Sequence, residues 1–216
     1  MAPTLYSILT SPPVRSVNMC AKAIGVDLNS INVDLYSGDH LKPEFLKINP
    51  QHTVPVLDDD GFILADSHAI MSYLVSKYGK DKSLYPTDLQ QRAIVDHRLH
   101  FDSSILFHRG LIISKSLIFE GAKEIPQKLL DQLSEAVHMV EKFLQNTKYV
   151  AGDQMSIADF SFVTSITSWE PYVPLTEAQF PKIMAWLKRM QELPYYSENQ
   201  IGLDQLLQVL KEKMPK

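Results

Sequence analysis

The chain of 216 residues can form one large domain or two small ones, and its 45% hydrophobic and 21% charged residues are ordinary for a protein with a buried core. The net charge of −4, with scattered basic residues, argues against nucleic acid or an anionic membrane as a partner. The single cysteine, Cys20, excludes an internal disulfide and a cysteine-based zinc site. No apolar run approaches the roughly 20 residues that span a bilayer, and the N-terminal residues lack a signal-peptide pattern, so we expect a cytoplasmic protein.

The N-terminal part of the chain mixes short apolar runs with helical patterns. The apolar runs predict strands at residues 5–10, 30–35, 54–57 and 62–65. The last two runs are joined across Asp60-Gly61, a strong hairpin signal. Helical patterns at residues 14–25 and 67–79 each end on a glycine, and a short helix is expected between the second and third strands. This order predicts a small α/β domain over residues 1–80.

The rest of the chain is helical in pattern. A polar segment before residue 88, KDKSLYPTD, is typical of a link between domains. Amphipathic stretches then predict helices at residues 89–120, 126–146, 157–169, 180–193 and 199–212. The fold class is therefore α/β plus all-α, with a helical domain over residues 88–216. A ligand site is expected in the cleft between the two domains.

Ser11 lies where the first strand gives way to the first helix, directly before Pro12 and Pro13. Prolines suit a helix start, because the first N–H groups have no partner within the helix. The free N–H groups and the helix dipole favour an anion beside Ser11. The alternative interpretation is that Ser11 only caps the helix, as serine commonly does.

Two further segments suggest a ligand site, although each has a plainer explanation. Val54-Pro55 opens a strand, where a cis proline would turn the backbone of Val54 towards an extended peptide. Asp66 and Ser67 stand at the start of a helix, where they could receive an ammonium group and a carboxylate, respectively. Both residues are also good helix caps.

The segments SPPVR, NPQHTVP and DSHAI occur in this order and are followed by SLYP and AGDQMSIADF. Together they resemble the cytosolic glutathione transferases of insects, Epsilon class more than Delta class, over essentially the whole chain. The resemblance implies a thioredoxin-like N-terminal domain, a helical C-terminal domain, a homodimer and glutathione as co-substrate, with no metal. It implies an enzyme of conjugation and detoxification, in which the thiolate of glutathione attacks apolar electrophiles.

The same resemblance implies roles for particular residues. Ser11 matches the serine that hydrogen-bonds to the sulfur of glutathione. The residues that match the glutathione site are His40, His52, Thr53, Val54, Pro55, Asp66, Ser67 and His68. Most relatives have Glu in place of Asp66, which implies a changed affinity for glutathione. The residues that match the hydrophobic-substrate site are Pro13, Leu35, Phe107, His108, Leu111 and Lys115.

Other candidates are weaker. Tyr6 invites comparison with tyrosine-type transferases, but it lies inside the predicted strand, and Cys20 lies well inside the first helix. The histidines of the long helix lack the pattern of a metal-binding helix. SIAD, ending at Asp159, is a capping signature that the family uses for folding. The alternatives to a detoxifying enzyme are a non-catalytic carrier of hydrophobic ligands and a glutathione-dependent step in endogenous biosynthesis.

Overall fold

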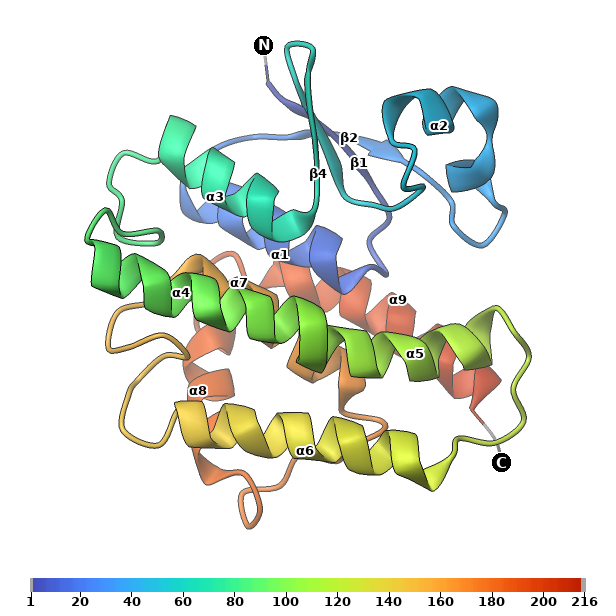
Figure 1. The fold of residues 1–216 in the computed structure, drawn as a ribbon, viewed down its shortest axis with the longest axis vertical. Coiled ribbons are helices and arrows are strands. Elements are labelled where there is room, and N and C mark those ends of the chain that lie inside the picture. Colours follow the sequence, from blue (N-terminus) through green and yellow to red (C-terminus); the bar gives the residue numbers. More distant parts are fainter. Residues whose placement is uncertain (1, 215–216) are drawn as a thin grey trace.

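The N-terminal part of the chain folds around a mixed four-stranded sheet (Figure 1). The computed structural model describes residues 2–214. The strands are β1 (Thr4–Ser7), β2 (Asn29–Asn32), β3 (Val56–Asp59) and β4 (Phe62–Ala65). They are arranged β2-β1-β3-β4, with β1 and β2 parallel and the other neighbours antiparallel. The predicted hairpin turn is confirmed, since Asp60 and Gly61 have the positive φ values of 57° and 85° that such a turn requires.

Helices cover both faces of this sheet. They are α1 (Pro12–Ala23), the 3-10 helix η1 (Asp39–Leu41), α2 (Pro43–Ile48) and α3 (Ser67–Tyr78). Side chains of β1 alternate between the faces, because successive residues of a strand point to opposite sides. Leu5 belongs to the core that contains Val14 of α1, whereas Tyr6 packs edge-on against Phe45 of α2 at 6.0 Å between ring centroids. This is the expected thioredoxin-like arrangement.

The rest of the described chain is helical. Its helices are α4 (Leu89–Phe101), the π-helix η2 (Asp102–Leu106), α5 (Phe107–Ile118), α6 (Gln127–Phe143), α7 (Ile157–Trp169), α8 (Pro181–Gln191) and α9 (Ser197–Lys213). The expected single helix over residues 89–120 is therefore interrupted by a π-helical segment. An amphipathic pattern does not reveal such a segment, because the chain stays helical through it. No helix within residues 2–214 is both long and apolar enough to cross a membrane.

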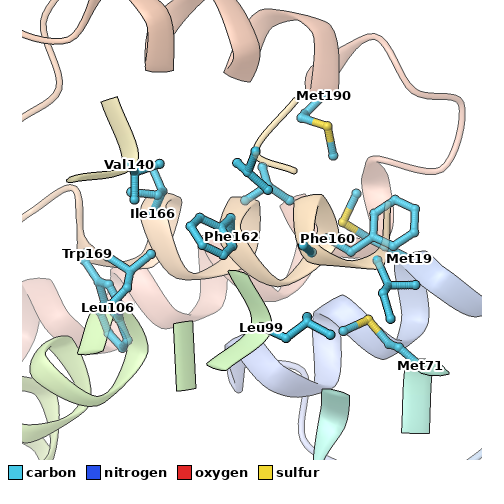
Figure 2. Close-up of a cluster of buried hydrophobic side chains, with 14 of the residues drawn as sticks. Met19, Met71, Leu99, Leu106, Val140, Phe160, Phe162, Ile166, Trp169 and Met190 are labelled. Atoms are coloured by element: carbon cyan, nitrogen blue, oxygen red, sulfur yellow. The ribbon is translucent and has the colours of Figure 1, made fainter. Parts of the chain in front are cut away.

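Helix α7 forms the centre of the molecule, and nearly all of its residues are buried. A helix that is apolar on all sides belongs in a core. Figure 2 shows Phe160, Phe162 and Ile166 of this helix among side chains from several others, including Met19 of α1 and Met71 of α3. The main hydrophobic core therefore runs from the helical part of the chain into the sheet-containing part without a break.

The predicted capping signature at the start of α7 is present. The Ser156 N–H donates to the carboxylate of Asp159 at 2.9 Å, and the Ser156 hydroxyl accepts from the Asp159 N–H. These two hydrogen bonds form a capping box. The carboxylate of Asp159 also accepts from the Val150 N–H and from the indole N–H of Trp186, both at 3.0 Å. Burial raises the pKa of Asp159 to about 6. These contacts join three segments of the helical domain, as a folding role requires.

Candidate functional site

Ser11 occupies the N-cap position of α1, as the sequence predicted, but its hydroxyl does not cap the helix. Pro12 and Pro13 start the helix, and Ser11 precedes it in an extended conformation. Its N–H donates to the Ile8 carbonyl at 3.0 Å, and its carbonyl accepts from the Arg15 N–H at 3.1 Å. Within residues 2–214 the Ser11 hydroxyl has no hydrogen-bond partner. The geometry thus favours a hydroxyl available to a ligand over a simple cap.

The second segment contains the cis peptide bond that the sequence allowed, between Val54 and Pro55. Asn49, which is 4% exposed, fixes the residues before it. Its side-chain amide donates to the Thr53 carbonyl at 2.9 Å and to the Thr53 hydroxyl at 3.2 Å, while its oxygen accepts from the Gln51 N–H at 3.1 Å. Asn49 was missed by the sequence analysis, although the Asn-Pro pair signals a turn.

The structure brings His40 and His52 together. Their ring centroids are 6.2 Å apart, although the two residues come from different loops. His52 has a positive φ of 48° and is exposed, and its N–H donates to the Asn49 carbonyl at 2.9 Å. His40 follows a left-handed Gly38, and its Nδ1 is buried without a partner among the described residues. A pair of half-exposed imidazoles at this place suits an anionic group.

Asp66 and Ser67 stand at the start of α3, as predicted. Oδ1 of Asp66 accepts from the N–H groups of His68 and Ala69, at 2.9 and 3.1 Å, so the capping interpretation is correct. No described residue donates to Oδ2, and Asp66 is exposed. Ser67 is buried, and its hydroxyl has no partner within residues 2–214. The cap therefore leaves one carboxylate oxygen and one hydroxyl for a ligand.

The side chain of His68 is already engaged by the helical part of the chain. Its Nε2 lies 2.6 Å from the hydroxyl of Ser161 in α7 and 3.4 Å from Oδ2 of Asp102 in η2. The Ser161 hydroxyl donates to the same Asp102 oxygen at 2.6 Å. His68 was expected among the glutathione-binding residues. In the structure its side chain holds the start of α3 against α7.

The residues expected to contact the hydrophobic substrate fall into two groups. Pro13 and Leu35 are half-buried in the N-terminal part, and Leu35 packs beside Val54 against a small core. On α5, the Phe107 ring lies 5.9 Å from that of Trp169, His108 and Leu111 are exposed, and Lys115 is 3.8 Å from Glu120.

One aromatic contact joins these two groups and was missed by the sequence analysis. Tyr36, next to Leu35, stacks on Phe119 at the end of α5, with 5.8 Å between ring centroids and an interplanar angle of 20°. The Tyr36 hydroxyl donates to the Thr10 hydroxyl at 3.1 Å, one residue before Ser11. The contact ties the end of α5 to the loop that carries Ser11. Residues this far apart in sequence give no local signal of such a pairing.

The weaker candidates have structural roles. Tyr6 packs between the sheet and α2, and Cys20 is fully buried, with burial raising the pKa of its thiol. Within residues 2–214, no three His, Cys, Asp or Glu side chains are grouped so as to hold a metal ion. A cavity of about 400 Å³ lies between β2, α1 and the start of α9, and none of the expected site residues lines it.

The chain is similar to known proteins over most of its length. The model of the glutathione S-transferase N-terminal domain matches residues 5–82, and that of the C-terminal domain matches residues 94–194. Glutathione S-transferase 1 of Manduca sexta is 46% identical over 202 residues, which are 92% of each chain. An Epsilon-class enzyme from the housefly Musca domestica is 47% identical, with a TM-score of 0.96, over 99% of this chain and 100% of that one. A homologue from Drosophila mojavensis, whose structure contains bound glutathione, is 47% identical, with a TM-score of 0.97, over 99% of this chain and 98% of that one.

The sheet-containing N-terminal part and the helical part of the chain both correspond to these proteins over almost the whole chain. Insect Epsilon-class and Delta-class enzymes are both among the structural neighbours, and the Epsilon-class ones share more residues with this chain. The chain therefore belongs to the glutathione S-transferase family, enzymes that use glutathione as a co-substrate, and it is most similar to the insect Epsilon class.

Proposed function

We propose that Ser11 donates its hydroxyl hydrogen to the sulfur of glutathione and so holds it as a thiolate. The observation that carries this proposal is the unused Ser11 hydroxyl beside the first turn of α1. A free thiol with a pKa near 8.5 is only a few per cent ionised at neutral pH. A hydrogen bond to a charged group contributes about 1.5–3 kcal/mol, which lowers the thiol pKa by about one to two units. The thiolate then becomes a major species at neutral pH.

The rest of the tripeptide is proposed to lie along the segments described above, in the domain of residues 1–80. The γ-glutamyl ammonium group pairs with Oδ2 of Asp66, and the carboxylate beside it binds the Ser67 hydroxyl. The cysteinyl part pairs with the backbone of Val54 between Thr53 and Pro55. The glycine carboxylate lies near His40 and His52. His68 supports this site through its contacts with α7.

The electrophile is proposed to bind against the domain of residues 88–216, opposite Ser11. Its surroundings are Phe107, His108, Leu111 and Lys115 of the helical domain, with Pro13 and Leu35 of the other. Leu111 is 38% exposed on α5 and so is accessible to a ligand. A pocket of this kind discriminates weakly, at about 1–3 kcal/mol per methylene. We therefore propose a broad role in detoxification of apolar electrophiles, carried out in the cytosol.

Replacing Ser11 tests the thiolate proposal. Ser11→Ala should raise the pH midpoint of kcat/KM by at least one unit while changing the KM for glutathione only a few-fold, because affinity is spread over the whole tripeptide. The assay is glutathione conjugation of an activated aryl halide over a range of pH.

Thr10→Ala is the matched control, since it removes a neighbouring hydroxyl that is bonded to Tyr36. It should leave the pH midpoint unchanged. If Ser11→Ala left the pH dependence of kcat/KM unchanged, the backbone N–H groups of α1 would be the groups that stabilise the thiolate. A wild-type protein that binds apolar ligands but conjugates none would instead be a carrier.

A further inference from the structure

Arg15 is a fully buried cation on the first helix, one turn after Ser11. Its Nη2 donates to the Thr164 carbonyl at 3.3 Å and to the Ser168 hydroxyl, both in α7. Its Nε and Nη1 are buried and have no hydrogen-bond partner among residues 2–214. A guanidinium group has five N–H donors, so most of this group is unsatisfied.

No described carboxylate pairs with this charge. Helix α7 offers Arg15 only the neutral Thr164 and Ser168, and the one titratable side chain that acts on it is the phenol of Tyr196, before α9. Burial lowers the pKa of Arg15 to about 9, which leaves the guanidinium charged at neutral pH. A buried ion without a counter-ion is normally strongly destabilising. The charge therefore requires an explanation other than stability.

The location of the Arg15 charge near Ser11 offers an explanation for its burial. The Arg15 N–H bonds to the carbonyl of Ser11 at 3.1 Å, and its side chain runs beside Leu9, since a Cβ added to Gly202 would meet both Leu9 and Arg15. The guanidinium itself lies against α7, at Thr164 and Ser168. One helical turn of about 5.4 Å separates Arg15 from Ser11, and with the lengths of the two side chains added we take the distance from the guanidinium to a sulfur held at Ser11 as on the order of 10 Å.

We propose that the uncompensated charge of Arg15 stabilises the glutathione thiolate at Ser11 through space, across the first turn of α1. The inference rests on the thiolate role proposed for Ser11. Arg15 is a positioning residue in this scheme, because it supplies a fixed positive field and touches neither sulfur nor electrophile. In this proposal the thiolate of glutathione is the anion that balances the buried guanidinium of Arg15. The same thiolate is the nucleophile of the reaction.

The expected size of the effect follows from Coulomb's law. Two unit charges about 10 Å apart, at an effective dielectric constant of about 20, shift an ionisation by roughly one pH unit. That shift corresponds to about a tenfold change in the thiolate fraction below the midpoint. It adds to the contribution proposed for the Ser11 hydroxyl.

The decisive experiment neutralises the charge while keeping Arg15 in place. Ser168→Asp sets a carboxylate against the guanidinium, and Ser168→Asn is a neutral control of nearly the same size at the same buried position. The pH midpoint of bound glutathione is read from the ultraviolet absorbance that distinguishes a thiolate from a thiol. Ser168→Asp should raise this midpoint by about one unit, whereas Ser168→Asn should leave it within a few tenths.

Two substitutions of Arg15 itself complete the test. Arg15→Met should raise the pH midpoint of bound glutathione by about one unit. Arg15→Lys keeps the positive charge, so its midpoint should stay close to that of the wild type. Equal midpoints in Ser168→Asp and Ser168→Asn, or in Arg15→Met and Arg15→Lys, would overturn the proposal and leave Arg15 as a packing residue. Ser11→Ala is measured beside them. A shift in the Arg15 variants without one in Ser11→Ala would reject the Ser11 role alone.

Discussion

Asp66 caps α3, and in the proposed function it also binds the ammonium group of glutathione. Its Oδ1 takes both capping hydrogen bonds, from His68 and Ala69, so the helix start does not need the second oxygen. Its positive φ of 76° sets the carboxylate at the mouth of α3. Asparagine is as good a cap as aspartate but carries no charge. The two roles can therefore be separated with a single substitution.

Asp66→Asn should raise the KM for glutathione about tenfold and leave thermal stability nearly unchanged. Tenfold corresponds to about 1.4 kcal/mol, which is above the 0–1 kcal/mol of a surface ion pair. The loss is not greater, because Asp66 is exposed before glutathione covers it. The turnover number should change less, since the ammonium group is remote from the reacting sulfur. Steady-state kinetics and thermal unfolding of the same preparations give both quantities.

Asp66→Glu and Asp66→Ala are the controls. Glutamate keeps the charge and should recover most of the affinity, whereas alanine should lose affinity and about 1 kcal/mol of helix capping. If asparagine left the KM unchanged and alanine only lowered the melting temperature, Asp66 would be a helix cap alone.

The sequence predicted the local conformation of those candidate residues whose position depends on the neighbouring chain. Ser11 before two prolines, Val54-Pro55 and Asp66 at a helix start are all placed by the few residues around them. The α7 partners of His68 and Arg15 could not be predicted, because they lie more than ninety residues away in the sequence. A helical pattern shows that α7 is buried, but it does not show which of its polar side chains meets which partner. Asn49 acts locally and could have been found from its Asn-Pro turn.

Element order was likewise predictable, and close contacts between elements were not. The predicted strands and helices are present with ends that differ by a few residues, apart from the single helix expected over residues 89–120, because apolar periodicity records which face of an element is buried. The π-helix between α4 and α5 and the approach of α9 to the loop before α1 depend on tertiary packing. Gly202 lies where α9 approaches the loop before α1, since a Cβ there would meet the Leu9 carbonyl and the Arg15 side chain.

Gly202→Ala should destabilise the protein by about 1–3 kcal/mol, although alanine favours a helix by about 1 kcal/mol over glycine. The added methyl would push α9 away from the backbone of Leu9, which cannot yield as a flexible side chain would. Because Leu9 precedes Ser11 by two residues, we also expect kcat to fall. Urea denaturation and steady-state kinetics measure the two effects.

The comparison variant is Gln205→Ala, at an exposed position of the same helix. It should change stability by no more than about 0.5 kcal/mol. A Gly202→Ala protein that is more stable than the wild type and fully active would show that α9 can shift without disturbing the loop of Ser11.

At the scale of the whole molecule, the described chain leaves apolar side chains exposed along one side. Phe62 is 48% exposed on β4 and lies against Tyr73 of α3, and Leu89 and Ile94 of α4 are 79% and 44% exposed. Figure 1 shows α3 and the start of α4 on the same side of the molecule. We propose that these elements form the interface of a two-fold symmetric homodimer, since closed two-fold dimers are the commonest soluble oligomers.

Ile94→Glu should convert the dimer into a monomer at micromolar concentration, because it places two charges, one from each copy, in an apolar interface. Ile201→Glu is the matched control, since Ile201 is 57% exposed on α9, which is not one of the proposed interface elements. Sedimentation velocity should give a dimer mass for the wild type and Ile201→Glu, and a monomer mass for Ile94→Glu. Since no proposed glutathione contact lies on α4, monomeric Ile94→Glu should still bind glutathione. A monomeric wild type would reject the proposed dimer, and a dimeric Ile94→Glu protein would place its interface elsewhere.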